Sequence, residues 1–250
     1  MKAKLKKRSI WKSIKTEFRF FVRARFTKPL APHQWVFIAG CYNSGTTLLN
    51  TILGSHPQIE LLPREGVELT DVLPRPEKYG WPRMWHKCES EMLIEKSNEV
   101  VVAERIRRHW ASNISGSIGE KILVEKSIAN LPRLEFFYTH FKPAKFIYIM
   151  RNGYAVAEGI RRRVDPRIWG RTEFGASYPI KLCAEQWAAS DRAYKSTKNL
   201  IGDVLEISYE ELTDETAATL EKVSSFLAVE AFPEAVLNTE WLIHREKSPI

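Results

Sequence analysis

The residues between Gly40 and Leu49 carry the clearest chemical signal in this chain. Two glycines frame a short loop there, and the residues that follow are typical of the start of a helix. Backbone N–H groups of such a loop form a concave anion site with the positive end of the helix dipole. This spacing therefore predicts a cradle for a phosphate-like group. Its candidate contacts are Asn43, Ser44, Gly45, Thr46 and Thr47.

The residue after the second glycine indicates which kind of anion the loop binds. A loop that binds nucleoside triphosphates has Lys at this position, where it reaches the β- and γ-phosphates, followed by a Ser or Thr for Mg²⁺. This chain has Thr46 instead. We therefore expect the loop to hold a smaller anionic group, without a triphosphate and its metal.

Alternating strands and helices must position this loop. The expected strands are 35–39, 58–62, 121–124, 145–150 and 204–207, and the expected helices are 47–53, a segment near 131–141, and 181–198. The proline-rich stretch 63–85 is expected to be irregular, as is typical of a binding wall. The alternation predicts an α/β fold, a three-layer sandwich with a central parallel sheet covered by helices on both faces.

Polar residues follow several of these strands. In parallel α/β sheets, ligands bind beyond the carboxyl ends of the strands, so these residues are candidates for one site. They are the anion loop, Glu125-Lys126-Ser127, Arg151-Asn152-Gly153 and Tyr209-Glu210-Glu211.

Taken together, these segments resemble the sulfotransferases that use 3′-phosphoadenosine 5′-phosphosulfate (PAPS), in their carbohydrate and tyrosylprotein branches. The resemblance rests on Asn43–Leu49 with His56-Pro57, Glu125–Ser127, the strand ending in Arg151, Tyr209–Leu212 and the helix ending at Leu227, in this order. It implies a P-loop-like sulfotransferase fold. We expect a sulfotransferase domain at 35–250, preceded by a basic arm and linker at 1–34.

The resemblance also implies a role for each site residue. The amides of 43–47 would bind the 5′-phosphate of PAPS, and Arg151 would pair with the 3′-phosphate. Lys126 would neutralise charge on the bridging oxygen as it leaves. Glu65, with Glu68 in reserve, would accept the proton of the acceptor hydroxyl.

Two positions depart from the family's pattern. Asn43 stands where Arg or Lys is common, which leaves Lys126 or Arg64 to supply the missing charge. Gly159 stands where a Ser commonly follows the 3′-phosphate Arg by eight residues, and the arginines at 161–163 could replace that contact.

Two aromatic residues are candidates to stack on the adenine of the donor, Tyr209 and Trp187. Trp187 fits a core position of an amphipathic helix as well. Both interpretations stay open for this residue.

The sequence predicts a PAPS-dependent sulfotransferase that moves a sulfuryl group by direct in-line transfer to a hydroxyl of a carbohydrate, glycolipid or comparable polar acceptor. PAPS would be a co-substrate, and no metal is expected. Two alternatives stay open. One is a P-loop kinase-like phosphotransferase, and the other is a catalytically inactive nucleotide-binding protein, which Asn43 and Gly159 would suit.

Positive charge is concentrated at the start of the chain. Residues 1–28 hold eleven Lys or Arg against Glu17 alone, a local charge of +10 in a chain of net charge +8, which leaves −2 for the remainder. The basic composition therefore gives no argument that the domain binds nucleic acid. Aromatic residues among these cations suit a helix lying on an anionic membrane, and a solvated basic helix explains them equally well.

The three cysteines are widely spaced and indicate neither a disulfide framework nor a thiolate metal site. No apolar run is long enough to span a bilayer, and the arm lacks the continuous apolar core of a secretory signal. We expect a cytoplasmic protein, with peripheral membrane contact through the arm left open.

Overall fold

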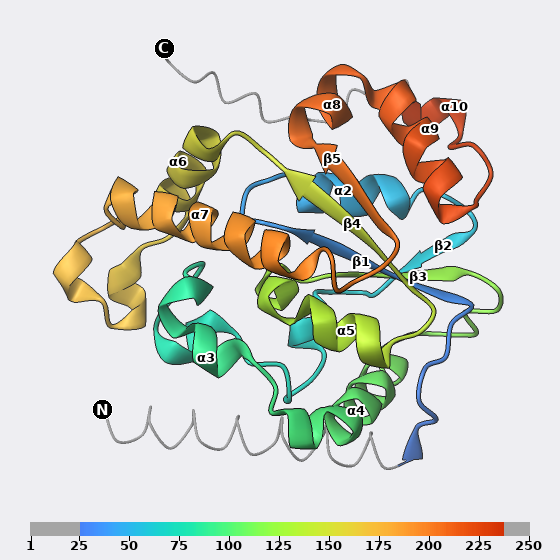
Figure 1. Cartoon of the computed structure of the whole chain (residues 1–250), viewed down its shortest axis with the longest axis horizontal. Coiled ribbons are helices and arrows are strands. Elements are labelled where there is room, and N and C mark those ends of the chain that lie inside the picture. Colours follow the sequence, from blue (N-terminus) through green and yellow to red (C-terminus); the bar gives the residue numbers. More distant parts are fainter. Residues whose placement is uncertain (1–25, 238–250) are drawn as a thin grey trace.

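A five-stranded sheet lies at the centre of the computed structural model, which describes residues 26–237 (Figure 1). Every pairing is parallel, and the strand order is β2-β3-β1-β4-β5. The strands are β1 Gln34–Gly40, β2 Ile59–Leu61, β3 Ile122–Lys126, β4 Ala144–Met150 and β5 Val204–Ser208. The parallel sheet that the sequence predicted is confirmed.

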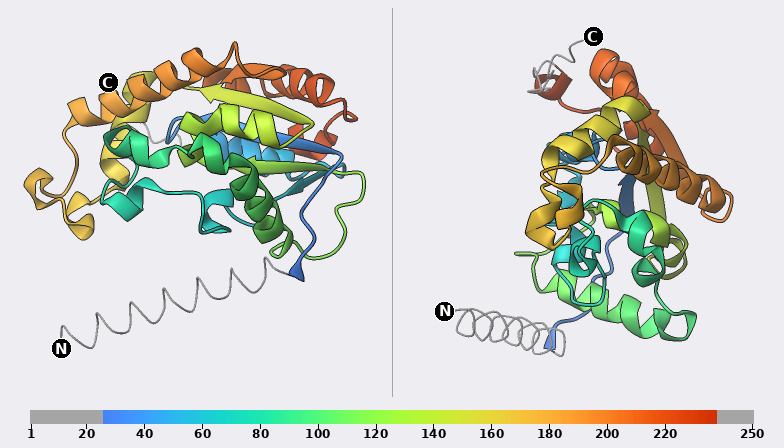
Figure 2. Two further views of the ribbon diagram at one scale, coloured as in Figure 1. Left: turned by 60° about the horizontal axis from the view of Figure 1, so that its bottom comes forward. Right: turned by 90° about the vertical axis from the view of Figure 1, so that its left-hand side faces the viewer.

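Helices cover both faces of the sheet (Figures 1 and 2). Successive side chains of β1 pack into the two separate cores that result. Trp35 and Phe37 pack on one face with α4, α5, α6 and α7, and Val36 and Ile38 pack on the other with α2, α8 and α9. The helices are α2 Thr46–Leu53, α3 Glu89–Met92, α4 Glu99–Ala111, α5 Leu134–His140, α6 Gly153–Arg163, α7 Ile180–Thr197, α8 Tyr209–Asp214, α9 Thr216–Leu227 and α10 Glu234–Leu237. A strand buried on both faces explains the nearly continuous apolar runs in the sequence.

An aromatic cluster fills the core on the α4 and α5 side. The Trp35 ring meets Phe141 edge-on at a centroid distance of 5.1 Å and lies 5.7 Å from Trp110. Phe37 lies 4.8 Å from Phe137. All five side chains are at most 2% exposed, so they anchor β1, and with it the loop that follows, on a rigid base.

Most predicted elements agree with the structure within three residues, but two regions differ. The segment near 131–141 begins as a 3₁₀ helix at Ile128–Arg133 and becomes α5 only after Pro132, because proline cannot donate the backbone hydrogen bond of an α-helix interior. Helix α4 was not predicted. The irregular stretch 63–85 is confirmed and holds only short 3₁₀ turns.

Some expectations fall outside the part of the chain that the structure describes. The basic arm lies mostly before residue 26, so its two interpretations stay predictions. Among the helices of the described residues, none is long and apolar enough to cross a membrane.

Candidate active site

The carboxyl ends of the five parallel strands meet at one edge of the sheet, and each predicted site segment follows one of them. In the order of the strands across the sheet, the segments are Glu65 after β2, Lys126 at the end of β3, the loop 41–45 after β1, Arg151 after β4 and Tyr209 after β5. The fold therefore brings together residues that are up to 168 positions apart in the sequence.

The loop between β1 and α2 has the backbone shape of an anion cradle. Asn43 and Gly45 have positive φ values of 61° and 100°, and the buried Ser44 Oγ donates a 2.7 Å hydrogen bond to the Cys41 carbonyl. Position 45 requires glycine, because a Cβ there would lie 2.5 Å from the Tyr209 ring. Helix α2 begins at Thr46, so its first N–H groups lie beside the loop.

Arg151 lies directly against this loop. Its Nη1 donates a 2.9 Å hydrogen bond to the Asn43 carbonyl oxygen, and its guanidinium lies 4.0 Å from the centroid of the Tyr209 ring. Tyr209 is the first residue of α8, whose start is fixed by a capping box in which Ser208 and Glu211 exchange hydrogen bonds. Arg151 and Tyr209 therefore form one wall of the loop.

Lys126 and Glu65 form an ion pair on the other side of the loop. Lys126 Nζ lies 2.6 Å from Glu65 Oε1, and the side chains are 13% and 36% exposed. A cavity of about 330 Å³ opens beside them. Its lining residues are Thr47, Asn50, Leu61, Leu62, Pro63, Arg64, Glu65 and Lys126.

A buried carboxylate, for which the sequence predicted no role, holds this region in place. Glu125 Oε1 accepts hydrogen bonds from the Gly66 N–H at 3.0 Å and from the Ser127 hydroxyl, and Oε2 accepts one from Asn130 Nδ2 at 3.1 Å. Burial raises the pKa of Glu125. The network ties the segment that carries Glu65 to the end of β3. The sequence signal for this structural role was a single acidic residue that follows an apolar strand run.

The two departures from the family's pattern lie against each other. A Cβ on Gly159 would lie 3.1 Å from the Asn43 side chain, so the glycine leaves the space that Asn43 occupies. Asn43 Nδ2 is buried and has no hydrogen-bond partner among residues 26–237. An unsatisfied buried donor inside an anion loop is the kind of group that a ligand oxygen would pair with.

Several other candidates take part in ion pairs with neighbouring side chains. Arg161 and Arg162 of α6 both bind Glu158, each at 2.7 Å. Glu68 accepts a 3.4 Å hydrogen bond from Arg75 and lies 3.9 Å from Arg64.

The two expectations for Trp187 have different outcomes. Trp187 is not a core residue, because it is 36% exposed, and its ring covers Gly153 at the start of α6. Its stacking on adenine stays a prediction.

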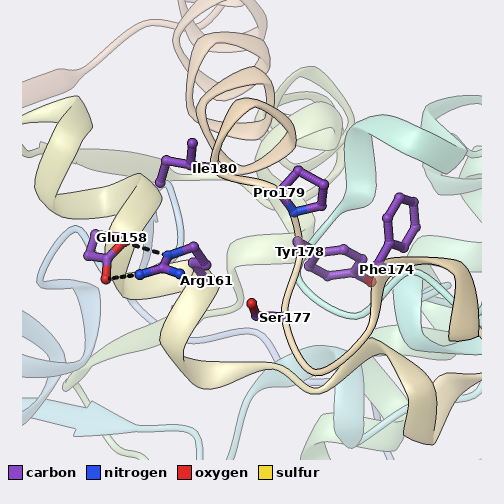
Figure 3. A pocket seen from close by; sticks show the side chains of 7 residues that line it. All are labelled: Glu158, Arg161, Phe174, Ser177, Tyr178, Pro179 and Ile180. Carbon is purple, nitrogen blue, oxygen red and sulfur yellow. Dashed lines mark hydrogen bonds and ion pairs between the residues drawn. The ribbon is translucent and has the colours of Figure 1, made fainter.

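A second cavity of about 520 Å³ lies between α6 and the segment before α7 (Figure 3). Figure 3 shows the Glu158–Arg161 pair at one side of it and the Phe174 and Tyr178 rings at the other. The Tyr178 hydroxyl is buried without a hydrogen-bond partner among the described residues. This cavity is separate from the one beside Lys126, because the two share no lining residue.

Among the described residues, neither the cysteine thiols nor a cluster of metal-binding side chains adds a further reactive group. All three cysteines are free and buried, and burial raises the pKa of Cys41, the first residue of the loop, to about 12. A thiol with such a pKa stays protonated at neutral pH. Within 26–237, no group of three or more His, Cys, Asp or Glu side chains could hold a metal ion.

Comparison with known proteins gives one family. A family model described as "Sulfotransferase family" matches residues 35–234. Protein-tyrosine sulfotransferase A of Caenorhabditis elegans is 25% identical over 221 residues, which are 86% of this chain and 54% of that protein, so the chain spans about half the length of this curated relative.

Solved structures share the fold. The sulfotransferase domain from the Synechococcus PCC 7002 olefin synthase has a TM-score of 0.52 and 22% identity, and the match covers 85% of this chain and 78% of that one. The sulfotransferase domain from the curacin biosynthetic pathway has a TM-score of 0.55 and 22% identity, and the match covers 81% and 76%. At this identity the similarity shows the fold alone.

Proposed function

The chain belongs to the sulfotransferase family, and from this premise we propose that it transfers a sulfuryl group from PAPS to a hydroxyl of a polar acceptor. One observation carries the proposal. Arg151 donates a 2.9 Å hydrogen bond to the carbonyl oxygen of Asn43, so a forked cation and the anion loop lie at one place. A single donor with phosphates at two positions can engage both.

The residues present fit such a donor. Residues 43–47 would bind its 5′-phosphate through backbone amides and the start of α2, and Arg151 would bind its 3′-phosphate. Gly40 keeps the cradle narrow, since a Cβ there would lie 2.6 Å from the Ile149 carbonyl oxygen. The unsatisfied Nδ2 of Asn43 adds a buried donor on a residue of the same loop.

Lys126 and Glu65 would carry out the chemistry. Glu65 accepts the proton of the acceptor hydroxyl while its oxygen forms a bond to sulfur. The bond between sulfur and the bridging oxygen breaks, and Lys126 stabilises the negative charge that this oxygen gains. The products are the sulfated acceptor and adenosine 3′,5′-bisphosphate, so atoms and charge balance without a further reactant.

The acceptor would enter the cavity of about 330 Å³ beside this ion pair. A hydroxyl of a carbohydrate, glycolipid or comparable polar molecule is the acceptor proposed first. The tyrosine hydroxyl of a protein is the second candidate, because a curated relative is named as a protein-tyrosine sulfotransferase.

Calorimetry and a transfer assay test the proposal. We expect adenosine 3′,5′-bisphosphate to bind with micromolar or tighter affinity and ATP with Mg²⁺ to give no heat. Labelled PAPS should then transfer sulfate to one of two acceptor sets, a glycan and glycolipid panel or tyrosine-containing peptides. Binding of ATP with Mg²⁺ would favour the kinase-like alternative. Bisphosphate binding without transfer to any acceptor would favour the inactive one.

A further inference from the structure

Arg83 is a cation that the fold brings to the anion loop from a distant part of the sequence. It belongs to the irregular segment 63–85, yet its Nη1 lies 3.5 Å from Asn43 Oδ1. Its guanidinium carbon lies 5.5 Å from the centroid of the Tyr42 ring. The contact with Asn43 is at the long limit of a hydrogen bond, so it leaves the guanidinium free to bind something else.

The charge of Arg83 has no carboxylate partner. Among residues 26–237, no carboxylate oxygen of Asp or Glu lies within 4.0 Å of the Arg83 guanidinium nitrogens. Arg64, by comparison, pairs with Glu68. Burial lowers the pKa of Arg83, and the nearby charge of Arg163 lowers it further. A partly buried guanidinium with no carboxylate in contact is stabilised when an anion binds beside it.

The backbone of Arg83 is held in an unfavourable conformation that fixes this position. Its φ is 61°, in the left-handed region, which is unfavourable for a residue with a Cβ. The neighbouring Met84 and Trp85 are fully buried and anchor the turn. Such strain persists only where the surrounding structure enforces it, and it clusters at functional sites.

The location of Arg83 selects one end of the donor. Arg151 contacts the backbone oxygen of Asn43, whereas Arg83 contacts its side chain. Asn43 stands where the resemblance expects a cation that stabilises the leaving phosphate, and Arg83 is a cation whose guanidinium lies against that side chain.

We propose that Arg83 binds the sulfuryl end of the donor and supplies the positive charge that Asn43 does not provide. The inference rests on the proposed function and adds to it a residue that touches the transferred group. Arg64, which the sequence suggested for this charge, pairs with Glu68 and is 63% exposed.

Two nucleotides that differ only in the sulfuryl group test the proposal. Calorimetry measures the affinities of PAPS and of adenosine 3′,5′-bisphosphate for the wild type and for Arg83→Gln. The loss of one charge-assisted contact should weaken PAPS binding about ten- to hundredfold, with less than a twofold change for the bisphosphate. Arg167→Gln is the matched control, since Arg167 is exposed and pairs with Asp165. It should change neither affinity.

The outcomes separate this inference from the proposed function. Equal losses for both nucleotides would mean that Arg83 only supports the loop, and unchanged PAPS affinity would remove Arg83 from the site. Either result overturns the inference while leaving the proposed function intact. A wild type that binds neither nucleotide overturns both. If Arg83→Gln fails to fold, Arg83→Lys replaces it in the test. This variant should weaken PAPS binding about threefold or more without a matching loss for the bisphosphate, because a Lys cannot reproduce the planar fork.

Discussion

Lys126 Nζ lies 2.6 Å from Glu65 Oε1, so the two residues proposed to carry out the chemistry form one ion pair. They come from the end of β3 and from the segment after β2, 61 positions apart. Each neutralises the other in the absence of ligands. Binding of donor and acceptor would replace this contact, because the leaving oxygen attracts Lys126 and the acceptor hydroxyl engages Glu65.

Replacing Lys126 should separate turnover from donor binding. Lys126→Ala is expected to lower turnover about a hundredfold, on the scale of losing one preorganised donor, with nucleotide affinity largely intact. Steady-state assays with labelled PAPS and calorimetry with the bisphosphate measure the two effects. Lys121→Ala is the control, because Lys121 pairs with Glu60 at 3.2 Å just before β3, at the other end of the strand. A parallel loss of affinity and turnover in Lys126→Ala would assign Lys126 to binding.

Replacing Glu65 should remove the general base. Glu65→Gln keeps the size of the side chain but cannot accept a proton, so turnover should fall by about 10²–10⁴. Glu68→Gln is the comparison, since Glu68 contacts Arg64 and Arg75. It should retain near wild-type turnover. If Glu68→Gln showed the large loss instead, the base would be reassigned to Glu68.

Arg151 should contribute to affinity and not to the chemical step. Arg151→Ala is expected to weaken binding of adenosine 3′,5′-bisphosphate by roughly 1.5–3 kcal/mol, as for a charge-assisted contact. Tyr209→Phe keeps the ring on which the guanidinium lies, 4.0 Å from its centroid, and should bind as the wild type does. Calorimetry measures both variants, and an unchanged affinity of Arg151→Ala would refute its assignment.

The contact between Arg151 and the loop was accessible from the sequence. Parallel strands end at a common edge, so residues that follow β1 and β4 must be neighbours once the two strands pair. The register confirms this, since Gly40 pairs with Ile149, two residues before Arg151. The type of fold followed from the same apolar runs. Both predictions needed only the local sequence, because apolar runs mark the strands and parallel strands end at a common edge.

The remaining features depend on contacts that no local pattern encodes. Arg83 reaches Asn43 from an irregular segment whose path is set by buried neighbours, and Glu125 acquires its role only when the Gly66 N–H approaches it. Helix α4 shows the same limit. It buries Ala103, Ile106 and Trp110 at helical spacing, but charged residues separate them.

Removing Glu125 should destabilise the fold as well as the site. Glu125→Ala leaves the Gly66 N–H, the Ser127 hydroxyl and the Asn130 amide without their acceptor in a buried place. Unsatisfied buried donors cost about 1–3 kcal/mol each, so we expect a loss of about 3 kcal/mol in the free energy of unfolding. Urea denaturation measures it, with the exposed Glu120→Ala as the control. Equal stabilities of the two variants would contradict a structural role for this network.

Glu158 gives a prediction about pH that involves stability and not turnover. Hydrogen bonds from Arg161 and then from Arg162, each at 2.7 Å, hold the pKa of Glu158 at about 2. A carboxyl of an unfolded chain titrates at about 4.3, so the folded state favours the ionised form. The stabilisation is therefore fully present above pH of about 4.3 and is lost as pH falls toward 2. Solvent screening at this exposed site limits it to under about 1 kcal/mol.

Glu158→Gln tests this sign directly. The variant should unfold at a lower urea concentration than the wild type at pH 7. The difference should shrink at pH 3.5, because the unfolded wild type then binds a proton at this carboxyl while the folded state keeps it ionised, and the amide of the variant does not titrate. Lys195→Gln breaks the Asp191 pair on α7 and serves as a control for a general loss of surface charge. A difference that stays constant from pH 7 to pH 3.5 would mean that Glu158 stabilises α6 through packing, since only an ionised carboxylate gains from the two arginines.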